Sequence, residues 1–380
     1  MPEKDMPSMH VVIAATSANT IAAFLLPYIR WHRRRGHYVT TVAGAGLIPP
    51  GALESDSHLP IHLNRSPKSA LRGGMHLFCE LRRVSKPADL VVTHTPIVSA
   101  LLRLAVRSLP ARERPKVIYI AHGFHFHTNG RPVANLIFKL IEGTWSRFTD
   151  AVVTINREDY HLATTSRLFA RERVHYMPGI GISVADYSNV ARDRSSAFAR
   201  SLSVNQDASL VGVIGNFDPG KRQLDVLTAL NLVSKERRPT VIFAGDGRLH
   251  DVCIGRASDL GLLPWVRFIG RTDRVPELLS VIDVLLMPSE REGLPRSVLE
   301  ALASGTPIIG ARARGTAELL EGHGWLFDVG DTAELAQLLE RVGSRASLPP
   351  LPAATFINRY SITESLSAYS QIVCRVTSSF

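Results

Sequence analysis

The chain has 380 residues, of which 45% are hydrophobic and 21% are charged, a composition typical of a soluble globular protein with more than one core. Lys and Arg outnumber Asp and Glu by 44 to 34, and the net charge of +10 favours an anionic partner such as a polyphosphate or an anionic lipid surface. The three widely spaced cysteines predict neither a disulfide framework nor a zinc site, and the lack of a recognisable nucleic-acid-binding motif disfavours nucleic acid as a partner.

Membrane and export signals are not expected in this sequence. No apolar run approaches the roughly 20 residues that span a bilayer, and residues 1–5 are too polar for a secretory signal. We therefore expect a protein of the reducing cytoplasm.

The first half of the chain alternates short apolar stretches with helical patterns. This alternation predicts a doubly wound α/β sheet, and the glycine-rich segment 178–182 is the expected hinge at the domain's end. The predicted buried strands lie within residues 10–15, 38–42, 61–63, 89–94, 116–121 and 149–155.

Cations gather at the end of the first predicted helix, which Gly36 terminates. Arg33, Arg34 and Arg35 follow Trp31 there. Cations stabilise a helix C-terminus through the helix dipole, so the cluster has a purely structural explanation. It suits an anionic membrane surface equally well, with Trp31 at the interface. The sequence leaves both interpretations open.

Three histidines, His122, His125 and His127, occupy the loop after the strand at 116–121. Their alternating spacing is compatible with a metal site, but no carboxylate or thiol lies near them in the sequence to complete one. Because ligands bind beyond the carboxyl ends of parallel strands, the loop is still a candidate site.

A helix is predicted after the histidine loop. Its apolar residues recur at helical spacing, and the simplest interpretation is a helix that faces the core. These residues are Val133, Leu136, Ile137, Leu140 and Ile141.

The second half repeats the alternation of strands and helices. The strand at 210–215 leads into a glycine-bearing loop with two adjacent cations, Lys221 and Arg222, at the start of a helix. Backbone N–H groups and cations in such a loop suit a diphosphate, although the residue order is not that of a Walker A loop. Gly245 ends the next strand in a tight turn. Arg271 begins a later loop, where a surface-turn arginine is almost as good an explanation.

Residues 281–307 predict a strand, a loop, a helix of about ten residues and a turn. Pro295 suits the first helical turn, and Gly305 suits the helix end. Glu292 then lies in the loop and Glu300 inside the helix, up to about 12 Å further along its axis. One carboxylate could bind sugar hydroxyls and the other a ribose, with a diphosphate between them at the helix N-terminus. Taken singly, each glutamate also has a structural explanation, as a favourable charge at a helix start or a solvated surface charge.

This stretch resembles the Glu-x7-Glu motif of the retaining GT-B glycosyltransferases of family 4. Residues 149–159 and 178–182 are similar to the subgroup of that family that acts in bacterial capsule and exopolysaccharide synthesis. The motif residues that match in the family's order are Asp283, Pro288–Ser289, Glu292–Gly293–Leu294–Pro295, Leu299–Glu300–Ala301, Ala303–Ser304–Gly305–Thr306–Pro307 and Gly315.

The resemblance implies the GT-B fold, in which two doubly wound Rossmann-like domains face each other across a cleft. The acceptor-side domain would cover residues 1–180 and the nucleotide-sugar-binding domain residues 181–360. A helix within 361–380 would pack back on the first domain.

The resemblance also assigns roles to individual residues. His122, Lys221 and Glu292 are the implied catalytic residues, and His125 and Trp31 are on the acceptor or membrane side. Most of the family has arginine where this chain has Asn216, so Arg222 is the expected substitute cation. The implied donor site contains Gly215, Asn216, Lys221, Arg222, Gly245, Arg271, Glu292, Gly293, Leu294 and Glu300.

The implied activity is retaining transfer of a sugar from a nucleotide-diphosphate sugar, UDP-linked by expectation, without a metal ion or cofactor. The acceptor would be a saccharide or a polyprenyl-diphosphate-linked glycan in the cytoplasmic leaflet. We therefore expect peripheral attachment to the inner face of the cell membrane through Trp31, Arg33, Arg34 and Arg35. Two alternatives use the same donor pocket: a nucleotide-sugar epimerase or hydrolase, and a non-catalytic nucleotide-sugar-binding protein. Turnover that needs an acceptor distinguishes the transferase from both.

Overall fold

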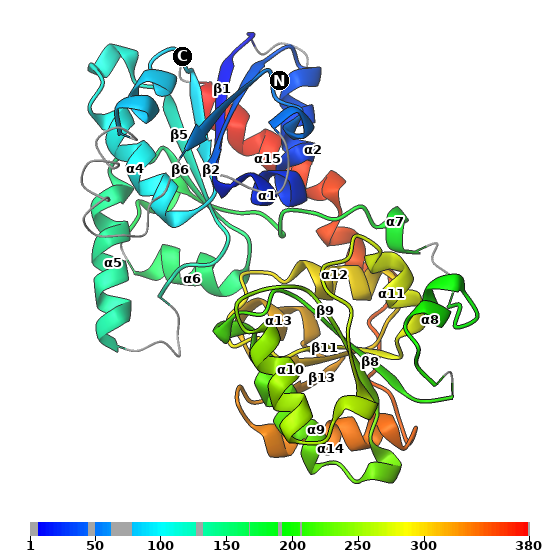
Figure 1. Cartoon of the computed structure of the whole chain (residues 1–380). Helices are drawn as coiled ribbons and strands as arrows, with labels where there is room; N and C mark the ends of the chain where they lie inside the picture. The colour runs from blue at the N-terminus through cyan, green and yellow to red at the C-terminus, as the bar shows by residue number, and fades with distance from the viewer. Residues whose placement is uncertain are drawn as a thin grey trace. The chain divides into compact units, whose positions relative to one another are not determined.

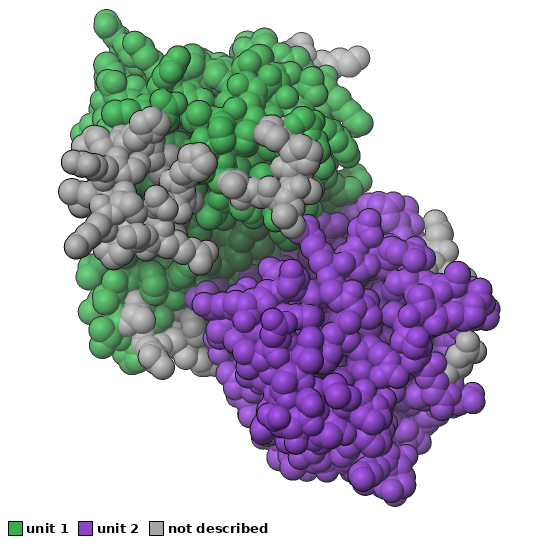
Figure 2. All heavy atoms as spheres, viewed as in Figure 1, with its two compact units in different colours: residues 1–181, 362–380 green, residues 182–361 purple. Residues whose placement is uncertain are grey.

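The computed structural model describes residues 7–44, 50–61, 78–126, 132–166, 168–188, 192–205 and 207–378. The chain divides into two compact units, which Figure 2 shows in green and purple. Unit 1 comprises residues 1–181 together with 362–380, and unit 2 comprises residues 182–361. The C-terminal segment therefore belongs to the same unit as the N-terminal half of the chain.

Unit 1 is built on a sheet that has seven parallel strands over its described residues. Residues 11–15, within the interior strand His10–Ser17, are fully buried, which explains why the sequence there is a continuous apolar run. Of the predicted strand at 61–63, residues 62 and 63 lie outside the described part of the chain. In sheet order the strands are β3 (Ser57–Ile61), β2 (Tyr38–Gly44), β1 (His10–Ser17), β4 (Leu90–Thr93), β5 (Lys116–Ala121), β6 (Ala151–Thr154) and β7 (Val174–Tyr176).

The helices of unit 1 alternate with these strands, as the sequence predicted. The C-terminal helix packs on the second helix of the chain, seen in red beside blue in Figure 1, and the Tyr369 hydroxyl lies 2.8 Å from His32 Nε2. The main helices are α1 (Ala18–Thr20), the π-helix η1 (Ile21–Leu25), α2 (Leu26–Arg34), α4 (Pro96–Arg107), α5 (Pro132–Ser146), α6 (Arg157–Thr165) and α15 (Ile362–Thr377).

Unit 2 has the same architecture, with six parallel strands over its described residues. Separate hydrophobic clusters pack against the sheet. The strands, in sheet order, are β10 (Val266–Phe268), β9 (Thr240–Ala244), β8 (Leu210–Ile214), β11 (Val284–Met287), β12 (Ile308–Ala311) and β13 (Trp325–Phe327). The helices are α7 (Ala185–Ser188), α8 (Ala197–Ser201), α9 (Gln223–Leu232), α10 (His250–Asp259), α11 (Val275–Val281), α12 (Arg296–Ala303), α13 (Arg314–Leu320) and α14 (Thr332–Gly343).

The predicted fold class is confirmed as two α/β units, each with a doubly wound parallel sheet. The strand order β10-β9-β8-β11-β12-β13 in unit 2 repeats the order β3-β2-β1-β4-β5-β6 in unit 1, and unit 1 adds β7 at one edge. This order reverses direction beside the first strand of each unit, and such a switch point is where open α/β sheets bind their ligands.

The prediction that α5 faces the core with its aliphatic stripe is wrong. Phe138 packs against the core and Glu142 is buried, so α5 covers the sheet with its other side. The stripe residues Val133, Leu136, Ile137, Leu140 and Ile141 are 43 to 71% exposed. The prediction that these residues share one helical face was correct. The prediction that this face points to the core was not, because it points to solvent.

The prediction that Trp31 enters a membrane interface is also wrong. Trp31 is only 7% exposed, because its ring packs edge to face against Tyr369 of α15 and the Arg35 guanidinium covers it at 4.0 Å. Arg33 forms an ion pair of 3.1 Å with Asp56. The cation cluster at the end of α2 is thus largely engaged within unit 1, and Arg34 is exposed beside it.

Candidate active site

The candidate donor site lies at the carboxyl edge of the sheet in unit 2, where the loops after β8, β9 and β11 meet. The backbones of two of these loops touch, since a Cβ added to Gly245 would lie 2.0 Å from the Gly215 carbonyl oxygen. The Gly215 N–H donates to Ala244 O at 3.0 Å, and the Gly245 N–H donates to Gly270 O at 2.8 Å. Glycine is therefore required at position 245 to bring the loops together.

An ion pair joins two of the predicted site residues. Lys221 Nζ lies 2.5 Å from Glu292 Oε1, although the residues are 71 positions apart in the chain. The loops that carry them are also joined by their backbones, because the Glu290 N–H donates to Gly220 O at 3.0 Å. Both side chains retain some exposure, so an anionic ligand can reach the ammonium group.

Arg222 lies beside this pair in a left-handed backbone conformation, with φ 55° and ψ 34°, at the N-terminal end of α9. Its Nε donates to Asp225 Oδ2 at 2.6 Å and its Nη1 donates to Glu290 Oε2 at 3.2 Å. A non-glycine residue in this conformation is strained by about 1–2 kcal/mol, and such strain often marks a functional site. The two carboxylates hold the guanidinium next to the Lys221 loop.

The loop Glu292–Gly293–Leu294 packs on the start of α13. A Cβ at Gly315 would lie 2.1 Å from the Gly293 carbonyl oxygen, and the Gly315 N–H donates to Glu292 O at 3.4 Å. Asp283, another residue of the sequence motif, accepts a hydrogen bond of 2.8 Å from the Leu210 N–H and pairs with Arg194. Gly315 therefore shapes the carboxyl edge of the sheet, whereas Asp283 joins the starts of β8 and β11 at the opposite, amino edge.

Glu300 lies within α12 and is only 5% exposed. The Tyr187 hydroxyl of α7 donates to Glu300 Oε1 at 2.7 Å, and Arg296 Nε donates to the same oxygen at 2.7 Å. The predicted boundaries of this helix hold, because it starts after Pro295 and Gly305 follows it with φ +69°. The structural explanation that Glu300 is a solvated surface charge is wrong, because a buried carboxylate needs the partners it has here.

Two further predicted site residues, Asn216 and Arg271, are exposed in loops of unit 2. Asn216 is exposed in the loop after β8, and its carbonyl oxygen accepts from Gln223 Nε2 at 2.9 Å. Arg271 is exposed just after β10. Both remain predictions as donor-binding residues.

In unit 1, the carboxyl edge of the sheet carries a pair of histidines. His94 follows β4 and His122 follows β5, and His94 Nδ1 lies 3.0 Å from His122 Nε2. Burial lowers the pKa of His94 well below its usual value, and burial also lowers the pKa of His122 to about 4. Both rings are therefore neutral near pH 7, and one donates a hydrogen bond to the other.

A buried carboxylate supports the loop that carries His122. Asp159 Oδ2 accepts from the Phe124 N–H at 3.2 Å and from Asn156 Nδ2 at 2.8 Å. His125 lies against Phe138, with a distance of 5.0 Å between the ring centroids. His127 lies outside the described residues.

Sequence reasoning missed three residues of these sites. Arg296 precedes Glu300 by four positions, so the helical i, i+4 rule could have found this pair. Tyr187 is 113 residues from Glu300, and no local pattern connects them. His94 was read only as a strand end, because its partner is on the neighbouring strand.

Among the described residues, no group of three or more His, Cys, Asp or Glu side chains is arranged to hold a metal ion. Each helix in the described part of the chain is too short or too polar to cross a membrane.

Comparisons with known proteins agree on one family. Residues 208–344 match the family described as "Glycosyl transferases group 1". EpsD of Bacillus subtilis (strain 168), which is named as a glycosyltransferase, is 30% identical over 89% of this chain and 88% of its own length. An Escherichia coli relative, UDP-Gal:alpha-D-GlcNAc-diphosphoundecaprenol alpha-1,3-galactosyltransferase, is 24% identical over 67% of this chain and 66% of its own length. The fold matches that of Anabaena HepE in complex with UDP-glucose, with a TM-score of 0.74 at 18% identity over 97% of this chain and 100% of the other.

Proposed function

Because this chain belongs to the group 1 glycosyltransferases and is a transferase of bacterial polysaccharide synthesis, we propose that it moves a sugar from a UDP-sugar to a polyprenyl-diphosphate-linked saccharide. We further propose that the transfer retains the anomeric configuration of the donor. The donor site is the carboxyl edge of the unit 2 sheet.

The ion pair between Lys221 and Glu292 is the observation that carries this proposal. It places a cation and a carboxylate side by side, at the edge where open α/β sheets bind ligands, and we propose that this carboxylate binds the donor sugar. Without a partner, the flexible Lys221 side chain would sample many positions. The ion pair with Glu292 holds its ammonium group in one position. When a donor binds, its diphosphate competes for the ammonium group and its sugar hydroxyls bind the carboxylate.

The leaving diphosphate gains charge as the glycosidic bond breaks. Lys221 and Arg222 are in place to neutralise that charge, and preorganised partners of this kind do not need to reorient during the reaction. We therefore propose that the two cations take the part that a metal ion has in other transferases. Asn216 stands where the second cation is expected, so Arg222 takes the place of that cation.

Glu300 would bind the ribose of the nucleotide. Its carboxylate is held by the Tyr187 hydroxyl and by Arg296, so it is oriented before the donor arrives. Because the Glu300 carboxylate is already oriented, it loses little side-chain entropy when it binds the two ribose hydroxyls. UDP is the preferred nucleotide because the Escherichia coli relative uses UDP-Gal and HepE binds UDP-glucose.

The acceptor side is proposed for unit 1. The Escherichia coli relative acts on a diphosphoundecaprenol-linked sugar, and such an acceptor stays in the bilayer. His122 is neutral and hydrogen-bonded to His94, so it can contact sugar hydroxyls without adding charge. With this acceptor, the enzyme works at the cytoplasmic surface of the membrane.

The test is a transfer assay with UDP-glucose, UDP-galactose and UDP-N-acetylglucosamine, using a short-chain polyprenyl-diphosphate N-acetylhexosamine as acceptor. We expect one donor to raise the melting temperature and to give UDP release that depends on the acceptor. The anomeric configuration of the product, read by NMR, tests retention. UDP release at the same rate without acceptor would indicate a hydrolase, and donor binding without any product would indicate a binding protein.

A further inference from the structure

The outward face of α5 is the largest row of exposed aliphatic side chains in the described part of unit 1. Its five members occupy positions i, i+3, i+4, i+7 and i+8 of one helix, so they form a continuous stripe. They are Val133, Leu136, Ile137, Leu140 and Ile141, with exposed fractions from 43 to 71%. Soluble surfaces seldom expose such a stripe unless it meets a partner. Figure 1 shows α5 at the outer edge of unit 1.

The charges on α5 indicate which partner the stripe suits. Its one acidic residue, Glu142, is buried and lies 3.3 Å from Arg103 Nη2 on the inner side. Lys139 has its ammonium group 5.9 Å from the Phe126 ring. The outward face of the helix therefore carries no carboxylate, and the exposed Arg147 comes directly after the last helical residue, Ser146.

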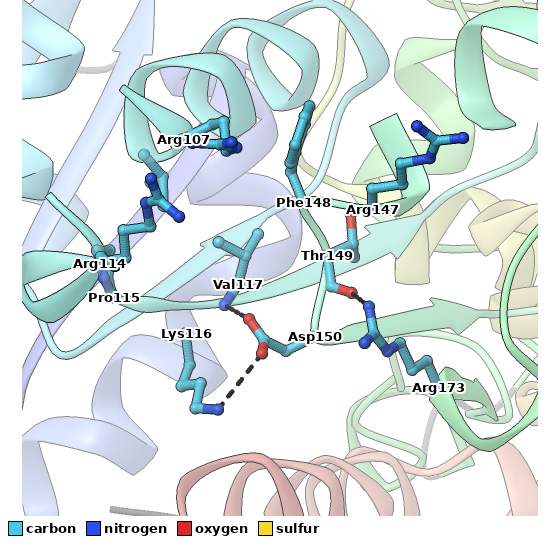
Figure 3. A pocket seen from close by; sticks show the side chains of 12 residues that line it. Arg107, Arg114, Pro115, Lys116, Val117, Arg147, Phe148, Thr149, Asp150 and Arg173 are labelled. Carbon is cyan, nitrogen blue, oxygen red and sulfur yellow. Dashed lines mark hydrogen bonds and ion pairs between the residues drawn. The ribbon is translucent and has the colours of Figure 1, made fainter. Parts of the chain in front are cut away.

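A basic pocket of about 430 Å³ adjoins the C-terminal end of α5. It opens at the amino edge of the unit 1 sheet, the edge opposite His94 and His122. Figure 3 shows Arg107 and Arg114 on one side of Phe148, and Arg147 and Arg173 on the other. The pocket is lined by Val106, Arg107, Ala111, Arg114, Pro115, Lys116, Val117, Arg147, Phe148, Thr149, Asp150 and Arg173.

Five cations thus share this pocket with a single carboxylate. Asp150 is already engaged, since its Oδ2 accepts from the Val117 N–H at 2.8 Å and its Oδ1 lies 3.4 Å from Lys116 Nζ. The excess positive charge suits phosphate groups, which accept several hydrogen bonds from guanidinium groups. Arg147 belongs both to this pocket and to the outward side of the α5 segment.

We infer that the α5 stripe and the basic pocket form one surface that docks unit 1 on an anionic lipid bilayer. The aliphatic side chains enter the boundary between headgroups and acyl chains, and the pocket cations bind lipid phosphates. Each cation near the surface and each buried methylene adds to the attraction, and two such signals together give reversible attachment.

Other occupants explain only half of these observations. A second copy of the chain would cover the stripe but would leave the excess positive charge of the pocket, five cations against one carboxylate, without an anionic partner. A free phosphate ligand would fill the pocket but would leave the stripe in water. An anionic bilayer satisfies both, because it presents apolar and phosphate layers next to each other.

This inference deepens the proposed function and rests on it for its purpose, since a lipid-linked acceptor requires the enzyme to reach the bilayer. It also replaces the α2 cluster as the expected docking surface, because Trp31 is buried and Arg33 is paired.

The test is co-sedimentation of the full chain with vesicles of phosphatidylcholine alone or with one quarter phosphatidylglycerol, at low and high salt. One variant combines Leu136→Gln with Leu140→Gln, and another combines Arg107→Gln with Arg147→Gln. The matched controls are Leu232→Gln with Val252→Gln, whose side chains in unit 2 are similarly exposed, and Arg33→Gln with Arg34→Gln on α2.

We expect the wild type to bind the anionic vesicles and to lose binding as salt rises. The stripe variant (Leu136→Gln with Leu140→Gln) and the pocket variant (Arg107→Gln with Arg147→Gln), together the α5-side variants, should each lower the partition coefficient about tenfold or more. Both control variants should keep the wild-type partition coefficient. Unchanged melting temperatures and UDP binding identify variants that are still folded. Should one α5-side variant fail to fold, the other still decides the result.

Three results would overturn the inference. The first is equal binding by wild type and both α5-side variants, and the second is loss of binding in the α2 variant instead. The third is a wild-type dimer that the Leu136→Gln, Leu140→Gln variant converts to a monomer while neither protein binds vesicles. Transfer to a soluble acceptor is measured in parallel, so that failure of docking and failure of the proposed transferase activity are separate outcomes.

Discussion

The carboxyl edges of the two sheets have the same topology, but one carries charged side chains and the other carries neutral ones. In unit 2 the edge carries charged pairs, such as Lys221 with Glu292, that retain access to solvent. In unit 1 it carries His94 and His122, which are hydrogen-bonded to each other and neutral near pH 7. The same fold can therefore present a charged or an uncharged ligand surface, depending on the side chains in its loops.

This difference matches the two substrates that we propose. A nucleotide-diphosphate sugar is a polyanion whose charge increases when its bond breaks, so it needs the cations of unit 2. Sugar hydroxyls are neutral and need hydrogen-bonding groups, which neutral imidazoles supply. In unit 1 the cations gather instead at the opposite edge of the sheet, where the basic pocket lies.

The largest effect is expected from the charged edge. Lys221→Ala should lower the transfer rate about 10²- to 10³-fold, because removing one preorganised partner of a developing charge costs roughly 3–4 kcal/mol. The exposed cation Lys235, elsewhere in unit 2, gives the control Lys235→Ala, which should keep its activity. Steady-state UDP release with acceptor measures both. If a chelator abolished wild-type activity and magnesium restored it, the leaving group would need more than these two cations.

Acid should destabilise unit 1 through another buried, neutral histidine, His32 of α2. Burial, followed by the charges of His37 and Arg35, lowers the pKa of His32 to about 3 in the folded protein, against about 6.5 in an unfolded chain. The unfolded state therefore binds the proton first, and the free energy of unfolding falls as the pH drops from about 6.5 towards 3. Between pH 7.5 and pH 5 this histidine should remove about 2 kcal/mol.

Urea unfolding of the wild type and of His32→Gln at both pH values measures this effect. The variant loses the contact with Tyr369 and is expected to be less stable at pH 7.5, but its stability should depend less on pH by about 2 kcal/mol. An identical pH dependence in the two proteins would show that His32 is not the group that resists protonation.

The two glutamates of unit 2 should separate binding from turnover. Glu300→Ala should weaken UDP binding about tenfold or more, because it also leaves Arg296 and Tyr187 without their shared acceptor. Glu292→Ala should mainly lower turnover, since its carboxylate contacts the transferred sugar. Calorimetric binding of UDP and the transfer rate with saturating donor distinguish the two. Equal donor affinity and equal rate in both variants would reduce the motif to a structural role.

The smallest effect is expected from Tyr187→Phe, which removes one hydroxyl and keeps the ring. Glu300 would retain Arg296 as a partner, so UDP affinity should fall only about threefold to tenfold, the value of one hydrogen bond of about 1 kcal/mol. The same calorimetric titration measures it. A loss as large as that of Glu300→Ala would show that the tyrosine, and not the arginine, orients the carboxylate.

The sequence by itself determined the local elements and the loops that bear the site. Continuous apolar runs predicted buried strands, such as residues 11–15, because both faces of a parallel sheet are covered. Pro295 and Gly305 predicted the limits of α12, because proline and glycine act on the backbone where they stand. Lys221 and Glu292 were predicted as loop residues because glycine and proline residues beside them interrupt the regular elements.

Only the tertiary structure decided which faces and side chains have partners. Helical spacing showed that the α5 residues share a face, but period alone does not tell whether that face meets the sheet or the solvent. Trp31 is buried because Tyr369, more than 300 residues later in the chain, covers it. The partnership of Tyr187 with Glu300 and that of His94 with His122 likewise join distant segments. Such contacts depend on how the chain folds back on itself, and local sequence patterns carry no record of that.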